Sequence, residues 1–258
     1  MKLFPSASTI NWQWLGLNSH LLSHLAVRLS DSTLAIFSPP PFTPSVQAAL
    51  STHFPNSTSV SYLIAPDAEH YLYIHAWHSA FPSAHVVAPE SLIGKFNAGK
   101  ASTEKFPISI TFPLKTDDET HVVERFLKEF GCAYFPSAAR EIALLHKHSG
   151  TLLVADLIFN PPAKESYSLS SEDSDSGVMG WLFGMTRGLE GRPLKFQKWV
   201  LGLIAGKGDA RRQFSGTIKE VAEWEFERLV PCHGEVVEGK EAAQKVWKVV
   251  FQDLLEVE

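Results

Sequence analysis

The sequence contains little cysteine and no long hydrophobic run. Cys132 and Cys232 are its two thiols among 258 residues, and such a pair, in a chain without a secretory signal, favours reduced thiols over a disulfide framework. Polar residues between Ser6 and Gln13 interrupt the apolar segment that a signal peptide needs. No uninterrupted apolar stretch approaches the ~20 residues of a membrane-spanning helix. We therefore expect a cytoplasmic protein without a membrane contact.

Basic residues are in the minority. The chain has 23 Lys and Arg against 28 Asp and Glu, a formal charge of −5. Because chains that bind phosphate backbones usually carry excess positive charge, no nucleic-acid partner is expected and a nuclease is disfavoured. A hydrophobic share of 45% is enough for an ordinary core. At this length, one domain over residues 1–258 is the default.

Several catalytic motifs are missing from the sequence. It has no Gly-x-Ser-x-Gly elbow, no P-loop and no Gly-x-Gly-x-x-Gly after a strand. These absences leave a serine hydrolase, a nucleotide hydrolase and a dinucleotide-dependent oxidoreductase without support.

The hydrophobic pattern predicts an α/β protein. A strand hairpin is expected at 25–29 and 33–37, then a helix at 44–50, and the run 60–88 is typical of a strand–helix–strand crossover with its helix at 70–80. The pattern also predicts strands at 108–112, 132–135, 141–146, 151–156 and 228–231, and helices at 194–204, 210–227 and 241–255. The acidic, serine-rich residues 165–177 predict a mobile loop.

Polar, metal-capable side chains come directly after three of the predicted strands. Asp67, Glu69 and His70 follow the strand at 60–64, Asp156 ends the strand at 151–156, and His233 lies in a predicted loop after 228–231. In α/β layers the crevice beyond the carboxyl ends of strands is the usual ligand site. The pattern therefore predicts a metal or acid–base cluster.

The order of these segments resembles the metallo-β-lactamase superfamily, and within it a degenerate branch of domains of unknown function. The resemblance covers most of the chain and is carried by Val27–Leu29, Ile64–His70, Phe81–Ala84, Ser149–Asp156 and Val230–Gly234. It implies a four-layer αββα sandwich and an ancestry among metal-dependent hydrolases.

The chain departs from the superfamily at one of its two metal positions. The motif His-x-His-x-Asp-His, laid over residues 65–70, retains only His70; Ala65, Asp67 and Glu69 replace the other ligands. The superfamily also has a histidine in the turn before its penultimate motif strand, and the corresponding residues 133–140 contain none.

The resemblance implies that the other position persists. Its ligands would be Glu69, His70, Asp156 and His233, which can hold one divalent ion, with zinc expected first. Such an ion lowers the pKa of water toward ~7, which suits hydrolysis of a small ester, lactone or related substrate. The helical and loop region 166–227 is expected to be an insertion near the mouth of this site.

A second hypothesis is a catalytically inactive scaffold that holds no metal and binds a small molecule or a protein partner. The lost histidines favour it, and the four retained polar groups argue against it. Each ligand candidate also has a simpler interpretation: Glu69 can stabilise a helix N-terminus, Asp156 can cap a turn, and loop histidines are often exposed.

Other candidates are weaker. His75 and His78, three residues apart on a predicted helix, indicate one packed and one exposed ring, and His20 and His24 are expected to be structural. His146 and His148 share one face of a strand and could supply a missing imidazole only if that face meets the cluster. Cys232 is expected to be a buried, inert thiol because neighbouring side chains in an extended segment point apart.

Overall fold

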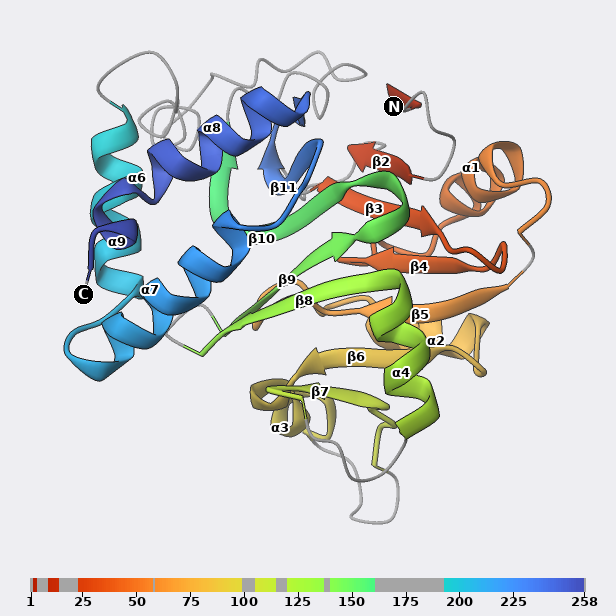
Figure 1. Cartoon of the computed structure of the whole chain (residues 1–258). Helices are drawn as coiled ribbons and strands as arrows, with labels where there is room; N and C mark the ends of the chain where they lie inside the picture. The colour runs from red at the N-terminus through yellow and green to blue at the C-terminus, as the bar shows by residue number, and fades with distance from the viewer. Residues whose placement is uncertain are drawn as a thin grey trace, which may run out of the picture.

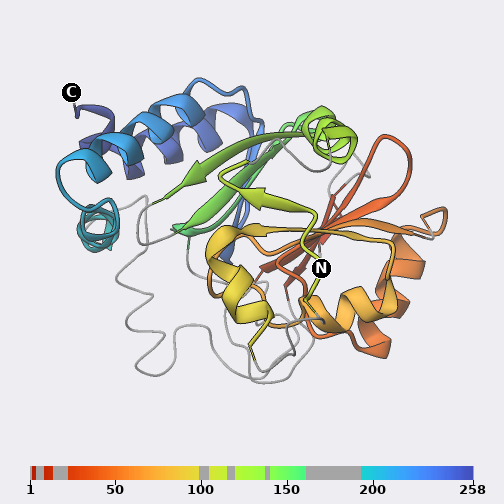
Figure 2. The ribbon, with the colours of Figure 1, turned by 90° about the horizontal axis from the view of Figure 1, so that it is seen from below.

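The computed structural model describes residues 2–3, 9–13, 23–57, 59–98, 105–114, 120–136, 140–160 and 193–257. Two β-sheets lie between two sets of helices, with α1, α2 and α3 on one outer side and α6 to α9 on the other (Figures 1 and 2). The predicted αββα sandwich is confirmed. Among the described residues, no helix is long and apolar enough to cross a membrane.

The first sheet holds seven strands in chain order. They are β1 (Lys2–Leu3), β2 (Thr9–Gln13), β3 (Ser23–Arg28), β4 (Leu34–Phe37), β5 (Val60–Ile64), β6 (His85–Pro89) and β7 (Ile110–Phe112). Strands β1 to β4 pair antiparallel, including the predicted hairpin β3–β4, whereas β4 to β7 pair parallel. Every residue of β4 is buried, as expected for a strand covered on both faces.

The second sheet holds five strands in the order β12-β11-β10-β9-β8. They are β8 (Phe130–Phe135), β9 (Glu141–His146), β10 (Thr151–Asn160), β11 (Arg228–Gly234) and β12 (Val237–Glu238). Strands β10 and β11 pair parallel, and the other neighbours are antiparallel. The carboxyl ends of β10 and β11 therefore lie side by side.

The described helices are α1 (Pro44–His53), α2 (Ile74–Ala80), α3 (Ile93–Phe96), α4 (Thr120–Glu129), α6 (Pro193–Ile204), α7 (Asp209–Ala222), α8 (Lys240–Val250) and α9 (Gln252–Leu255), with short 3₁₀ turns at Glu90–Leu92 and Lys147–Ser149. Helix α4 belongs to neither outer set, because its Phe126 packs into the cluster between the sheets. Helix α1 begins as its sequence predicts, because the hydroxyl of Thr43 accepts the N–H of Val46 at 3.3 Å and Pro44 occupies the first turn.

Three apolar clusters hold the layers together. One lies beneath α1, α2 and α3 and includes fully buried Trp77. A second, with Phe37 and Phe126, fills the space between the sheets. The third joins α6 to α9 to the second sheet through residues such as Phe214 and Trp247.

Several predicted boundaries were wrong in ways that affect the candidate site. Strand β10 does not end at Asp156 but continues to Asn160, with Leu157 and Ile158 buried and with Phe159 and Asn160 paired to β11. Strand β11 includes the segment 232–234, which was expected to be a loop. Helix α2 begins at Ile74 rather than at 70, since turns occupy the residues before it.

The predicted insertion at 166–227 is described only from residue 193 onward. Its helices α6 and α7 lie in the outer layer over the second sheet (Figure 1). Phe214 is buried there, whereas Trp199 is 60% exposed. The predicted acidic loop at 165–177 lies outside the described residues.

Candidate metal centre

Three of the four expected ligands come together. One ligand atom from each of His70, Asp156 and His233 lies within 4.8 Å of the other two. His233 Nε2 is 2.8 Å from Asp156 Oδ1, and the centroids of the two imidazole rings are 5.3 Å apart. His70 follows β5 of the first sheet, whereas Asp156 and His233 belong to β10 and β11 of the second. The group therefore bridges the two sheets.

Asp67 holds His70 in place. One oxygen of its carboxylate accepts the backbone N–H groups of Glu69 and His70, at 2.7 and 2.9 Å, which closes a turn directly after β5. The carboxylate also lies 2.7 Å from His70 Nδ1. A carboxylate bonded to one ring nitrogen directs the other nitrogen toward a metal in many metalloproteins.

The second nitrogen of His70 is the observation that points most directly to a metal ligand. His70 is 6% exposed, and no described residue forms a hydrogen bond with its buried Nε2. Such an atom is costly to bury unless something binds it. A divalent cation shared with Asp156 and His233 would satisfy it.

Neighbouring charges shift the pKa values of His70 and Asp156 in opposite directions. Burial disfavours the charged imidazole of His70, but the hydrogen bond and charge of Asp67, with the charges of Asp156 and Glu69, outweigh burial and raise its pKa. Burial likewise opposes the charge on Asp156, and the neighbouring imidazoles of His233 and His70 overcome it and lower the pKa of that carboxyl. Asp156 is thus an anion near neutral pH, as a metal ligand must be.

Glu141, at the start of β9, holds the backbone at Asp156 through hydrogen bonds. The β9–β10 ladder pairs residues as far as Leu153. Beyond that point the fully buried carboxylate of Glu141 accepts the N–H groups of Ala155 at 2.6 Å and of Asp156 at 2.9 Å. It takes the place of the strand carbonyls that would otherwise satisfy these donors.

Burial, reinforced by the charges of Asp67 and Asp156, raises the pKa of Glu141 well above its usual range, although the two N–H bonds act in the opposite direction. We did not predict a role for Glu141 from the sequence. The sequence feature that could have indicated such a role is a single charged residue at the first position of an otherwise apolar strand.

One backbone bond joins the two sheets beside the cluster. The N–H of Ile142, next to Glu141, donates to the carbonyl of Pro66 at 2.8 Å. The loop that carries His70 is thereby attached directly to the strand that supports Asp156.

The fourth expected ligand, Glu69, is not brought into this group. Its side chain is 77% exposed, and its carboxylate lies 3.9 Å from Lys95 Nζ at the surface. Only one of the two acidic side chains in this short turn faces inward, and it is Asp67, at 2% exposure. The structure thus brings together three of the four side chains expected to be ligands.

The weaker candidates lie elsewhere. His75 and His78 both pack their rings against Phe106, with centroids 4.1 and 5.1 Å away, so neither is simply exposed. His146 is buried at the other end of β9, where its Nδ1 lies 2.7 Å from the Ser149 hydroxyl and burial lowers its pKa to about 4. His148 is exposed. His20 lies outside the described residues, and the side chain of His24 is not described.

Cys232 is buried, as expected. Burial, together with the charges of Asp67, Asp156 and Glu141, raises the pKa of its thiol well above the usual range. A protonated thiol is a poor nucleophile and a poor metal ligand.

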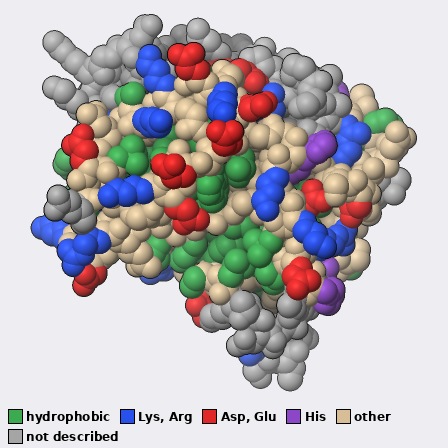
Figure 3. Space-filling view, in the orientation of Figure 1, with side chains coloured by type: hydrophobic (Ala, Val, Ile, Leu, Met, Phe, Trp, Pro, Cys, Tyr) green, Lys and Arg blue, Asp and Glu red, His purple; other side chains and the backbone are tan. Residues whose placement is uncertain are grey.

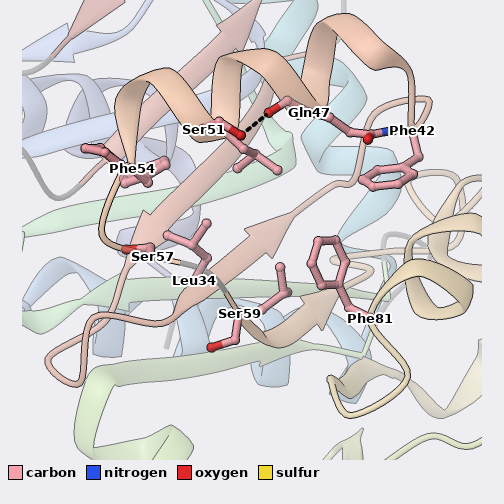
Figure 4. A pocket seen from close by; sticks show the side chains of 11 residues that line it. Leu34, Phe42, Gln47, Ser51, Phe54, Ser57, Ser59 and Phe81 are labelled. Carbon is pink, nitrogen blue, oxygen red and sulfur yellow. Dashed lines mark hydrogen bonds between the residues drawn. The ribbon is translucent and has the colours of Figure 1, made fainter.

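A separate hollow of about 430 Å³ lies beneath α1. Figure 4 shows Phe42 and Phe81 on one side of it and the hydroxyls of Ser57 and Ser59 on the other. Its lining includes Leu34 and Val60, which begin β4 and β5, and contains no His, Cys, Asp or Glu. The hollow therefore carries none of the chemistry of the cluster, which lies beyond the other end of β5.

Two imidazoles and one carboxylate suit a catalytic metal position. Catalytic zinc sites commonly use three protein ligands, including His₂Glu sets, and keep a further position for water or substrate. Non-haem iron(II) sites use two histidines and a carboxylate in a similar way. The donor set, together with the unsatisfied His70 Nε2, thus fits one divalent ion.

No protein-family model matches the sequence, and neither does any curated protein. Solved structures do match. The flavodiiron core of Flv1 from Synechocystis sp. PCC6803 has a TM-score of 0.56 and 14% identity, over 91% of this chain and 53% of that one. VMB-1 has a TM-score of 0.53 and 10% identity, over 97% and 95% of the two chains.

A third match is the peroxy diiron species of the chemotaxis sensor ODP, with a TM-score of 0.53 and 12% identity, over 99% of this chain and 94% of that one. At such low identity these likenesses concern the fold. Two mixed sheets between outer helices, seen also in these neighbours, show that the chain has the metallo-β-lactamase fold.

Proposed function

We propose that the chain is a metal-dependent hydrolase of a small ester, lactone or related substrate. One divalent ion would be held by His70, Asp156 and His233. The observation that carries this proposal is the buried His70 Nε2, which lacks a partner beside a carboxylate and a second imidazole.

A divalent cation bound there would supply Lewis acidity and bring the pKa of water toward ~7. The chain's own residues prepare the site for it. Asp67 holds the Nδ1 side of His70, which leaves Nε2 as the donor atom. Asp156 remains ionised and supplies the negative charge that a divalent ion requires.

We expect zinc first, and the donor set also suits iron(II). Two structural neighbours are diiron proteins, the chemotaxis sensor ODP and the flavodiiron core of Flv1. Metal analysis of the purified protein must therefore cover both elements.

The position of Glu69 favours a second candidate function. Its exposed carboxylate, together with the non-ligating Ala65, would be expected of an inactive scaffold that binds a small molecule or a protein partner. Figure 3 shows acidic and basic side chains interspersed over one face, without a continuous charged surface among the side chains described there.

Elemental analysis of tag-free protein by mass spectrometry tests the proposal. We expect close to one equivalent of zinc, iron or manganese in the wild type and loss of that metal in His70→Ala/His233→Ala. The double variant His75→Ala/His78→Ala is the matched control, because it removes two histidines outside the cluster and should keep the metal. Circular dichroism must show that each variant is folded.

An activity screen completes the test. Wild-type protein should hydrolyse aryl esters or lactones, and a chelator or the His70→Ala/His233→Ala substitutions should abolish the activity. Trace metal at equal levels in wild type and both double variants would refute the hydrolase proposal. Stoichiometric metal without hydrolysis of any ester or lactone would refute the proposed substrate class while the metal centre stands.

A further inference from the structure

The two imidazoles of the cluster are oriented in different ways. The ring plane of a histidine depends on χ2, a torsion with broad minima that the backbone alone does not fix. For His70, the hydrogen bond that its Nδ1 donates to the carboxylate of Asp67 sets this plane. His233 has, besides the contact of its Nε2 with Asp156, a ring against its face: Phe159 stacks on it, with centroids 4.8 Å apart and planes 14° from parallel.

Phe159 is placed for this contact by the sheet. It is the register partner of His233 in the parallel β10–β11 pair. The β10 register shifts between Val154 and Phe159, which is the interval that contains Asp156. The irregularity allows Asp156 to reach His233 Nε2 while Phe159 covers the ring of the same histidine.

Helix α6 holds Phe159 from the other side. The β9–β10 ladder pairs residues as far as Leu153, six positions before Phe159. The side-chain amide of Gln197, 2% exposed on α6, faces the backbone of Phe159. In the amide orientation that satisfies both ends, its oxygen accepts the N–H of Phe159 at 2.9 Å and its nitrogen donates to the carbonyl of Phe159 at 3.3 Å. One buried amide thus satisfies both backbone groups of this residue.

We propose that Phe159 is a positioning residue for His233, and that Gln197 of α6 fixes Phe159 in turn. This inference rests on the proposed metal centre and adds to it a connection from the outer helical layer to one ligand. The stacked ring restricts rotation of the imidazole, so that the lone pair stays directed at the ion. Contacts of this kind behind a ligand typically change metal affinity by 10- to 100-fold.

Cobalt(II) is a suitable probe because its visible absorption reports both binding and geometry. In Phe159→Leu, the dissociation constant for cobalt should rise about 10-fold and the absorption spectrum should change. Phe159→Tyr keeps the ring and should bind as the wild type does. The dissociation constant of Gln197→Leu for cobalt should lie between those of the wild type and Phe159→Leu.

The matched control is Phe130→Leu. Phe130 is a fully buried ring of the same sheet, which packs against Phe126 and pairs with His146 at the end of β9 far from Glu141. If Phe130→Leu weakens cobalt binding as much as Phe159→Leu does, the effect is one of general stability and the positioning role is wrong.

Proton NMR of the metal-free protein tests the contact itself. The ring protons of His233, assigned with His233→Gln, should move upfield in the wild type relative to Phe159→Leu because of the stacked ring. Unchanged ring shifts, or equal cobalt affinity in wild type and Phe159→Leu, would overturn the inference while the metal centre stands. Failure of the wild type to bind any cobalt would overturn the metal centre, and the positioning role with it.

Discussion

At the scale of single residues, the turn after β5 determines which carboxylate takes part in the site. Asp67 closes the turn with its own side chain and so lies inside, while Glu69 is directed to Lys95 at the surface. The sequence offers both acidic residues within three positions of His70. Because the choice between them depends on the turn's backbone hydrogen bonds, the spacing of residue types could not predict it.

Replacing Asp67 should therefore affect the centre more than replacing Glu69. In Asp67→Ala the ring of His70 loses its hydrogen-bonded partner, and metal affinity should fall by ~10- to 100-fold. Glu69→Ala should leave affinity within about twofold of wild type, since its carboxylate is exposed and screened. Competition titration with a chelator measures the metal affinities of both variants. A greater loss of affinity in Glu69→Ala than in Asp67→Ala would contradict the proposed ligand set.

His146 gives a prediction for pH. Burial lowers its pKa to about 4, so the folded state binds a proton less readily than the unfolded chain, whose histidines titrate near ~6.5. Stability is therefore lost as the pH falls from about 6.5 toward 4, by at most about 3 kcal/mol from this residue. His146→Gln should lose less stability than wild type between pH 7 and pH 4.5 in urea titrations. The control is His148→Gln, which replaces an exposed histidine nearby and should lose as much stability over this pH range as the wild type does.

At the scale of secondary-structure elements, the hydrophobic pattern predicted most strands correctly. The hairpin β3–β4 and the crossover β5–α2–β6 follow from alternation and from prolines at the strand ends. The extent of β10 does not follow, because its middle contains Asp156, a residue type that normally ends a buried strand. The carboxylate of Glu141, fifteen positions earlier, is what makes a continued strand possible there.

Removing that carboxylate should weaken β10. Glu141→Ala leaves the N–H groups of Ala155 and Asp156 without partners, and each buried unsatisfied group costs about 1–3 kcal/mol. We expect a loss of about 2–5 kcal/mol in the free energy of unfolding, measured by urea denaturation. Glu141→Gln keeps an acceptor oxygen and should lose less; equal losses in the two variants would show that the hydrogen bonds do not matter.

At the scale of the whole molecule, the proposed metal centre would take its ligands from both sheets. His70 comes from the first sheet, and Asp156 and His233 come from the second. The hydrogen bond from Ile142 N–H to the Pro66 carbonyl joins the loop after β5 to β9. The resemblance of the motifs indicated this sandwich from the sequence. The pairing of Phe159 with Gln197 could not be predicted, because it joins positions 38 apart across residues that share no motif (197 minus 159).

An ion bound between the sheets should stabilise the entire fold. At a free metal concentration 100 times the dissociation constant, the expected gain is about 2.7 kcal/mol. Scanning calorimetry should show a higher Tm for metal-loaded wild type than for the chelated protein. The His70→Ala/His233→Ala variant should show no such difference, and an equal shift in that variant would place the binding elsewhere.

The distance between these ligands along the chain also constrains biosynthesis. His70 and His233 are separated by 163 positions (233 minus 70). The two imidazoles cannot meet until residue 233 has been synthesised and the second sheet has packed against the first. A cation that both imidazoles hold is therefore acquired only by a chain whose two halves have already come together.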